Sequence, residues 1–178
     1  MKPQPPSPSR ILVAIAAVVA FGQSPPALAD GNHKSPESGI DYSKVEETAF
    51  GKAGDPKKAT RTVHIEMSDQ MRYTPAAITV KQGDTVKFVV KNGGKIMHEM
   101  VIGSIDELKA HSDMMKNYPG MEHDEAYMTH VPPGKTRNIV WQFSKTGEFN
   151  FGCLIPGHFE AGMVGKVTVL TTAKGASK

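Results

Sequence analysis

The chain has 178 residues, of which 39% are hydrophobic and 22% are charged. This composition is typical of one soluble globular domain with additional segments rather than of two full domains. The first 29 residues hold two basic side chains and no acidic one, so the formal net charge of +3 falls to +1 without them. A chain this close to neutral is not expected to bind nucleic acid or a polyanionic membrane surface.

The N-terminus has the pattern of a secretory signal peptide. Lys2 and Arg10 precede an apolar run over residues 11–22, and Ala27 and Ala29 form a small-x-small cleavage motif. We therefore predict a periplasmic protein whose signal peptide, residues 1–29, is cleaved after Ala29. The alternative is an uncleaved membrane anchor. The apolar run is too short to span a bilayer, so we expect no membrane span after cleavage.

The remaining chain divides into two tails and one domain. Residues 30–60 are polar and lack sustained periodicity, which predicts a flexible N-terminal tail. Residues 172–178 form a C-terminal tail. Between them, residues 61–171 alternate short apolar segments with turn signals, and this pattern predicts an all-β sandwich or barrel. The expected strands cover residues 62–67, 78–80, 85–90, 96–102, 137–143, 149–153 and 163–170.

One segment interrupts the strands. Residues 104–129 contain few strand-forming side chains, and residues 105–109 are weakly helical in character, so we expect an insertion with one or two helical turns. A connection of this length within a compact domain is usually functional or disordered. Residues 97–130, which include the insertion, are rich in soft metal-binding side chains, namely Met97, Met100, Met114, Met115, Met121 and Met128 together with His98, His111, His123 and His130.

The strongest chemical signal lies near the C-terminus, where Cys153, His158 and Met163 follow one another at intervals of five residues. Sulfur ligands prefer copper to hard cations, and imidazole binds copper in both oxidation states. A Cys, two His and a weak axial Met form the ligand set of a blue-copper electron-transfer site. The loop supplies one of the two histidines, and His98 on an earlier strand is the best candidate for the other.

Each of these residues also has an explanation without metal. Cys153 can be a small buried hydrophobe, Met163 core filler and His158 a solvated loop residue. However, Cys153 is the only cysteine of the chain. It cannot form an internal disulfide, and an unpaired thiol in an oxidising compartment is exposed to oxidation unless a ligand such as a metal occupies it.

Three stretches resemble the cupredoxin family, which includes plastocyanin, azurin and rusticyanin. They run from Tyr73 to Phe88, from Gly147 to Cys153 and from Gly162 to Val169, and the whole similarity covers residues 61–171. The resemblance implies a Greek-key β-sandwich that holds one type 1 copper ion. The spacing of the ligand loop is closer to that of rusticyanin than to the shorter loop of plastocyanin. The ligands implied by the resemblance are His98, Cys153, His158 and Met163.

The resemblance also implies features around the copper. Asn92 or Glu99 is expected to supply hydrogen bonds that tune the potential. The family usually has Asn or Asp directly after the first histidine ligand, whereas this chain has Glu99, so the hydrogen bond that braces the ligand loop is an open question. His158 is expected to lie partly exposed at an apolar rim that offers the electron route, formed by Pro156, Gly157, Phe159 and Ala161.

The Met- and His-rich insertion, together with the signal peptide, resembles periplasmic cupredoxins associated with bacterial copper tolerance. We expect a monomeric, non-enzymatic protein that cycles one copper between Cu(II) and Cu(I) and meets a redox partner protein or a copper-handling protein. The alternative is a Cu(I) buffer or chaperone that uses the insertion as a second, weak copper site, unless these methionines only fill gaps. An enzyme that oxidises Cu(I) would need further copper centres, and the chain has no His-x-His pairs with which to build them.

Overall fold

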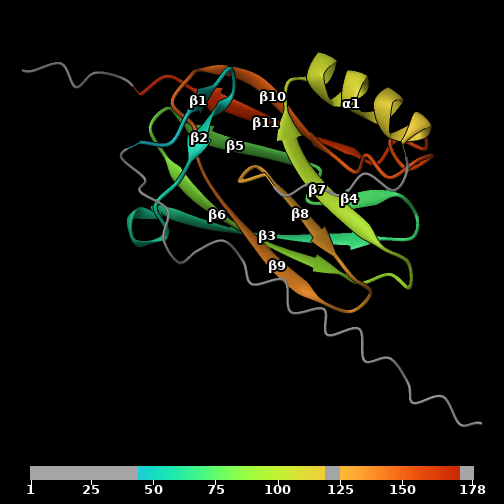
Figure 1. The fold of residues 1–178 in the computed structure, drawn as a ribbon. Coiled ribbons are helices and arrows are strands. Elements are labelled where there is room, and N and C mark those ends of the chain that lie inside the picture. The colour runs from blue at the N-terminus through green and yellow to red at the C-terminus, as the bar shows by residue number, and fades with distance from the viewer. Residues whose placement is uncertain (1–43, 119–124, 173–178) are drawn as a thin grey trace, which may run out of the picture. The chain divides into compact units, whose positions relative to one another are not determined.

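The computed structural model describes residues 44–118 and 125–172, which form two β-sheets packed face to face and one α-helix outside them (Figure 1). The prediction of an all-β sandwich is thereby confirmed. The signal peptide, residues 30–43 of the tail, residues 173–178, Met121 and His123 lie outside the described residues. Within the ranges that are described, no helix is long and apolar enough to cross a membrane.

Six strands form the first sheet: β1 (Glu47–Thr48), β2 (Gly51–Ala53), β3 (Arg61–Ser68), β4 (Arg72–Thr74), β6 (Thr85–Asn92) and β9 (Thr136–Gln142). Their order across the sheet is β1-β2-β9-β6-β3-β4. β3 and β6 are parallel, and the other neighbours are antiparallel. Alternation along β3 turns Val63, Ile65 and Met67 into the core and leaves His64 and Glu66 exposed.

Five strands form the second sheet: β5 (Ala77–Lys81), β7 (His98–Gly103), β8 (Met128–Val131), β10 (Gly147–Gly152) and β11 (Val164–Leu170). Their order is β5-β11-β10-β7-β8, with β5 parallel to β11. In both sheets the neighbours include strands far apart in the sequence, as Greek-key connections require. β8 begins inside the segment that the sequence assigned to the insertion.

The two sheets enclose one apolar core. Phe88 and Phe143 are fully buried in it and meet edge to face, with ring centroids 6.2 Å apart. Phe149, Phe151 and Cys153 also face this core, as the alternation along their strand predicted. β10 therefore delivers the Cys153 thiol from within the sandwich.

The domain begins earlier than the sequence indicated. The sequence predicts that residues 44–60 belong to a flexible tail, but they contain β1, β2 and the short 3-10 helix η1 (Pro56–Lys58). β2 pairs with β9, and Phe50 is buried and stacks on Trp141 with ring centroids 5.3 Å apart. Strands of two and three residues are too short to produce a periodic pattern, and this is why the segment resembles a tail in sequence.

Helix α1 (Ile105–Asn117) fills much of the predicted insertion and is longer than the one or two turns expected. A capping box begins it: Oγ of Ser104 accepts the N–H of Glu107, and the Glu107 carboxylate accepts the N–H of Ser104. Leu108 on the inner face of the helix belongs to the same apolar cluster as Leu154. Because Leu154 lies in the loop after β10, this cluster places α1 against that loop.

Candidate metal centre

Three of the four predicted copper ligands lie on the loop between β10 and β11. Backbone hydrogen bonds close this loop: the N–H of Cys153 donates to the carbonyl of Met163 at 3.1 Å, and the N–H of Met163 donates to the carbonyl of His158 at 3.0 Å. Gly157 and Gly162 both have φ of 88°, a conformation that side chains disfavour. These two glycines permit the tight turns that bring the three side chains together.

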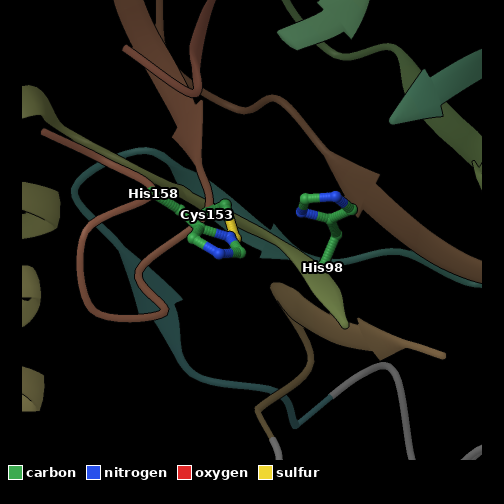
Figure 2. Close-up of side chains that lie close together, drawn as sticks. All are labelled: His98, Cys153 and His158. Atoms are coloured by element: carbon green, nitrogen blue, oxygen red, sulfur yellow. The ribbon is translucent and has the colours of Figure 1, made fainter. Parts of the chain in front are cut away.

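The fourth predicted ligand, His98, is the first residue of β7. β7 pairs with β10, and the register places Val101 opposite Gly152. The ligand atoms of His98, Cys153 and His158 all lie within 4.8 Å of one another, and their side chains converge in Figure 2. Sγ of Cys153 is 3.2 Å from Nδ1 of His158, and the two imidazole centroids are 5.0 Å apart.

The donor atoms fit a copper ion. Nδ1 of His98 is buried and has no hydrogen-bond partner within the described part of the chain. Leaving such a nitrogen unsatisfied is costly, and a metal ion would satisfy it. One thiol, two imidazoles and the fully buried thioether of Met163 make up the soft donor set that copper prefers. That these four residues are the ligands stays a prediction.

Burial and neighbouring groups shift the pKa values of Cys153 and His158 toward their neutral forms in the metal-free chain. Burial, and after it the negative charge of Glu99, raises the pKa of the Cys153 thiol to about 12. Burial and then the neighbouring His98 lower the pKa of His158. His158 and Cys153 would both hold a bound cation, and binding would require loss of the Cys153 proton, because the thiolate is the form that ligates metals.

Glu99 answers the open question about the brace of the ligand loop. Its carboxylate is almost fully buried and accepts the N–H of Leu154 at 2.6 Å. The other carboxylate oxygen lies 2.8 Å from Nε2 of His130 on β8. Since Leu154 directly follows Cys153, Glu99 ties the strand that carries His98 to the loop that carries the thiol.

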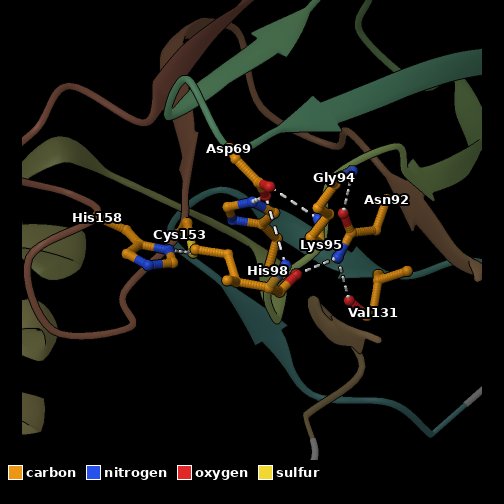
Figure 3. A network of polar contacts seen from close by, with 9 residues as sticks. Asp69, Asn92, Gly94, Lys95, His98, Val131, Cys153 and His158 are labelled. Carbon is orange, nitrogen blue, oxygen red and sulfur yellow. Dashed lines mark hydrogen bonds and ion pairs between the residues drawn. The ribbon is translucent and has the colours of Figure 1, made fainter. Parts of the chain in front are cut away.

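Asn92, the last residue of β6, supports the site at the start of the turn that leads to His98 (Figure 3). Its buried side chain donates to the carbonyls of Ile96 and Val131, both at 2.8 Å. Its oxygen accepts the N–H of Gly94 at 2.8 Å. Asn92 therefore fixes the path of the chain into β7, and its side-chain hydrogen bonds do not include the His98 ring.

Two residues near the site were not identified from the sequence. Asp69, in the turn between β3 and β4, accepts the N–H of Lys95 at 2.8 Å and lies 3.1 Å from Nε2 of His98. The amide of Lys95, and after it His98, lowers the pKa of the Asp69 carboxyl. Arg72, three residues later, donates to the carbonyl of Ala161 in the ligand loop at 2.9 Å. An Asp between two strands is common for purely local reasons, so the sequence held no distinguishing signal.

The described methionines of residues 97–130 are divided between core and surface. Met100 is buried in the main core and Met128 in the cluster beneath α1, where both fill space between apolar side chains. Met97 and Met114 are 41% and 40% exposed. Within the described ranges, the ligand loop and His98 provide the one group of three or more His, Cys, Asp or Glu side chains placed to share a metal. A second copper site in the insertion stays a prediction.

Polar contacts fasten α1 to the ligand loop. The buried hydroxyl of Ser112 donates to the carboxylate of Glu160 at 3.2 Å. Lys116 Nζ lies 2.6 Å from the same carboxylate oxygen. Since Glu160 lies between His158 and Met163, the insertion supports the loop from outside the sandwich.

The fold and site can be compared with known proteins. A sequence model of copper binding proteins of the plastocyanin/azurin family matches residues 59–170. The chain is 48% identical over 158 residues to the copper-resistant cuproprotein CopI of Rubrivivax gelatinosus, which covers 89% of this chain and 94% of that protein. It is 34% identical over 150 residues to CopI of Pseudomonas aeruginosa, covering 68% of this chain and 82% of that protein.

A solved structure also resembles this fold. The crystal structure of dithionite-reduced auracyanin from Roseiflexus castenholzii has a TM-score of 0.54 and 25% sequence identity, and the match covers 62% of this chain and 98% of that one. The resemblance proposed from the ligand loop and the flanking strands is thereby confirmed. Since the family match spans more than half of the sequence, this chain belongs to the plastocyanin/azurin family of copper-binding proteins.

Proposed function

We propose that this chain is a periplasmic type 1 copper protein that binds one copper through His98, Cys153, His158 and Met163 and carries single electrons in copper tolerance. The observation that supports this most strongly is the convergence of three ligand atoms within 4.8 Å, one of them from a buried imidazole whose Nδ1 has no partner in the described chain. The name of the CopI relatives as copper-resistant cuproproteins supports the physiological part.

Hydrogen bonds within the chain hold the metal-donor side chains in fixed positions. Bound copper supplies a one-electron couple between Cu(II) and Cu(I). Backbone hydrogen bonds fix Cys153 and Met163 relative to each other. Glu99 fixes the amide of Leu154, and Asp69 contacts Nε2 of His98. Such a site changes little between the two oxidation states, which keeps the rearrangement that accompanies electron transfer small.

His158 is the proposed route for the electron. It is half-buried, whereas the other three proposed ligands are buried. Pro156, Gly157 and Ala161 in the same loop are exposed, and Phe159 is half-buried. A redox partner that docks on this rim would approach the site through the His158 ring.

The experiment that tests the copper site is the visible absorption spectrum of the exported, purified chain after addition of Cu(II), with Cys153→Ser as the matched control. We expect an intense thiolate-to-copper band that the control lacks. Circular dichroism of both proteins establishes that they are folded. A folded wild-type chain without this band contradicts the proposal.

Electron transfer requires its own test. We expect the copper-loaded chain to exchange electrons rapidly with a c-type cytochrome in a stopped-flow experiment, and the copper-free chain to exchange none. In the source bacterium, deletion of the gene should lower growth on copper, and wild type but not Cys153→Ser should restore it. Fractionation should place the protein in the periplasm, and ultracentrifugation should give a monomer.

The alternative role as a Cu(I) buffer predicts a different stoichiometry. Met100 and Met128 are enclosed among apolar side chains, which favours a packing role for them. A pure carrier binds one Cu(I) per chain in a competition titration with a chromogenic chelator. More than one bound Cu(I), lost when Met114, Met115 and Met121 are replaced by Leu, supports the buffer.

A further inference from the structure

We infer that Asp69 is a positioning residue for copper, because its carboxylate holds His98 in the tautomer that carries the proton on Nε2 and so turns Nδ1 toward the metal. This inference rests on the copper site proposed above and adds to it a negative charge behind one ligand. The contact joins Oδ1 of Asp69 to Nε2 of His98 at 3.1 Å (Figure 3).

Hydrogen-bond chemistry selects the tautomer. A neutral imidazole has one N–H donor and one acceptor nitrogen, and an ionised carboxylate can only accept. The proton of His98 therefore lies on Nε2, between that nitrogen and Asp69. Nδ1 is then the acceptor, and this is the nitrogen that is buried without a hydrogen-bond partner in the described structure. Both ring nitrogens of His98 are thus assigned from contacts that the fold provides.

Two segments that are distant in the sequence form this contact. Asp69 lies in the turn between β3 and β4, and its other oxygen accepts the N–H of Lys95 at 2.8 Å. Gly94 allows the approach, since a Cβ atom at that position would lie only 1.9 Å from Oδ1 of Asp69. The carboxylate is therefore anchored to the same turn that leads into His98, and its position relative to the ring is fixed.

A carboxylate behind a ligating histidine has chemical consequences. It makes the imidazole a stronger donor, and loss of such a partner typically weakens metal binding by about 10- to 100-fold. The added negative charge favours Cu(II) over Cu(I), because the ion of higher charge gains more from it. We therefore expect Asp69 to tighten Cu(II) binding and to lower the reduction potential.

A purely structural role makes a different prediction. If Asp69 only caps the turn through Lys95, its replacement should change the stability of the chain and leave the tautomer and the potential as they were. Asp69→Asn tests this difference, because Asn retains the size and one acceptor oxygen but not the charge. Asp84→Asn is the matched control, since the Asp84 side chain also accepts a backbone N–H in a turn, that of Lys81, and does not contact a proposed ligand.

The first measurement is the tautomer of His98 in the copper-free wild-type chain, read from long-range ¹H–¹⁵N NMR correlations. The second is the reduction potential of both copper-loaded variants. We expect the Nε2–H tautomer in wild type and in Asp84→Asn, and its loss or mixture with the other tautomer in Asp69→Asn. We expect Asp69→Asn to weaken Cu(II) relative to Cu(I) by about 10-fold, which corresponds to a rise in potential of about 59 mV.

Two results overturn the inference. One is a copper-free wild-type chain in which His98 carries its proton on Nδ1, a result that needs no variant to fold. The other is a folded Asp69→Asn chain with the tautomer and potential of wild type. Failure of the proposed function is recognised separately, because it appears as the absence of the thiolate–copper band in wild type, whereas the NMR measurement uses no copper.

Discussion

Replacement of Glu99 by Ala should destabilise the copper-free domain strongly. Its carboxylate is 3% exposed, accepts the N–H of Leu154 and contacts the ring of His130. Without it, the amide that follows Cys153 loses its acceptor, and a buried donor left unsatisfied costs about 1–3 kcal/mol. Loss of the contact with His130 adds to this, and removal of one partner of a buried ion pair costs about 3–5 kcal/mol when both are charged. Since His130 is one-third exposed, we expect a total of about 3 kcal/mol.

The assay is equilibrium unfolding of the copper-free chain in urea, followed by circular dichroism. Glu99→Gln is the matched control, because the amide oxygen of Gln can still accept the N–H of Leu154 while the charge near His130 is lost. We expect this control to lose about 1 kcal/mol, one ordinary hydrogen bond. The slope of unfolding free energy against urea should be equal in all three proteins, which shows that the native state is comparably compact.

Two results would refute this reasoning. If Glu99→Ala lies within about 0.5 kcal/mol of wild type, the range of an ordinary surface substitution, then the carboxylate does not brace the loop. If Glu99→Gln is as unstable as Glu99→Ala, the charge rather than the accepted hydrogen bond carries the effect.

Three further results are expected. With a pKa of about 12, the Cys153 thiol is ionised at pH 8 in about one molecule in ten thousand. Iodoacetamide should therefore label it at least about 100-fold more slowly in the folded copper-free chain than in urea. Equal labelling rates would contradict the burial of the thiol. Gly165→Ala should cost about 2 kcal/mol or more in urea unfolding, because its new Cβ would lie 2.2 Å from the ring of Phe151 in the core; an unchanged midpoint would show that the ring can move aside. Ser112→Ala should lower the free energy of unfolding by about 1 kcal/mol, since it removes the hydrogen bond to Glu160. A decrease well above about 1 kcal/mol, measured in a thermal melt, would mean that the attachment of α1 depends on more than this hydrogen bond.

The parts of the fold that the sequence predicted are those with long, regular alternation. Phe149, Phe151 and Cys153 were placed on one face from spacing alone, and all three face the core. The sequence pattern does not predict the four shortest strands, because segments of two to four residues are too short to show an alternation of apolar and polar side chains. These strands are β1, β2, β4 and β8. The sequence pattern predicts only one or two turns for α1, although Ser104 and Glu107 have the spacing of a capping box, which is a local signal for the start of a helix.

The candidate site divides in the same way. Cys153, His158 and Met163 are close in sequence, so their spacing revealed them. Asp69 is 29 residues from His98 and meets it only because β4 returns beside β3 and the turn before β7 folds over the carboxylate. A contact that depends on the pairing of strands cannot be read from local composition, because many turns contain an Asp for reasons of their own.

The hairpin of β1 and β2 gives the domain a natural fluorescent probe. Trp141 is the only tryptophan of the chain, and its indole N–H donates to the carbonyl of Phe50 at 3.1 Å within that hairpin. Its emission therefore reports whether the N-terminal segment is attached to β9. Detachment would also uncover a strand edge that invites pairing with another molecule. A red shift of the Trp141 emission would then indicate that a stored sample is prone to aggregate.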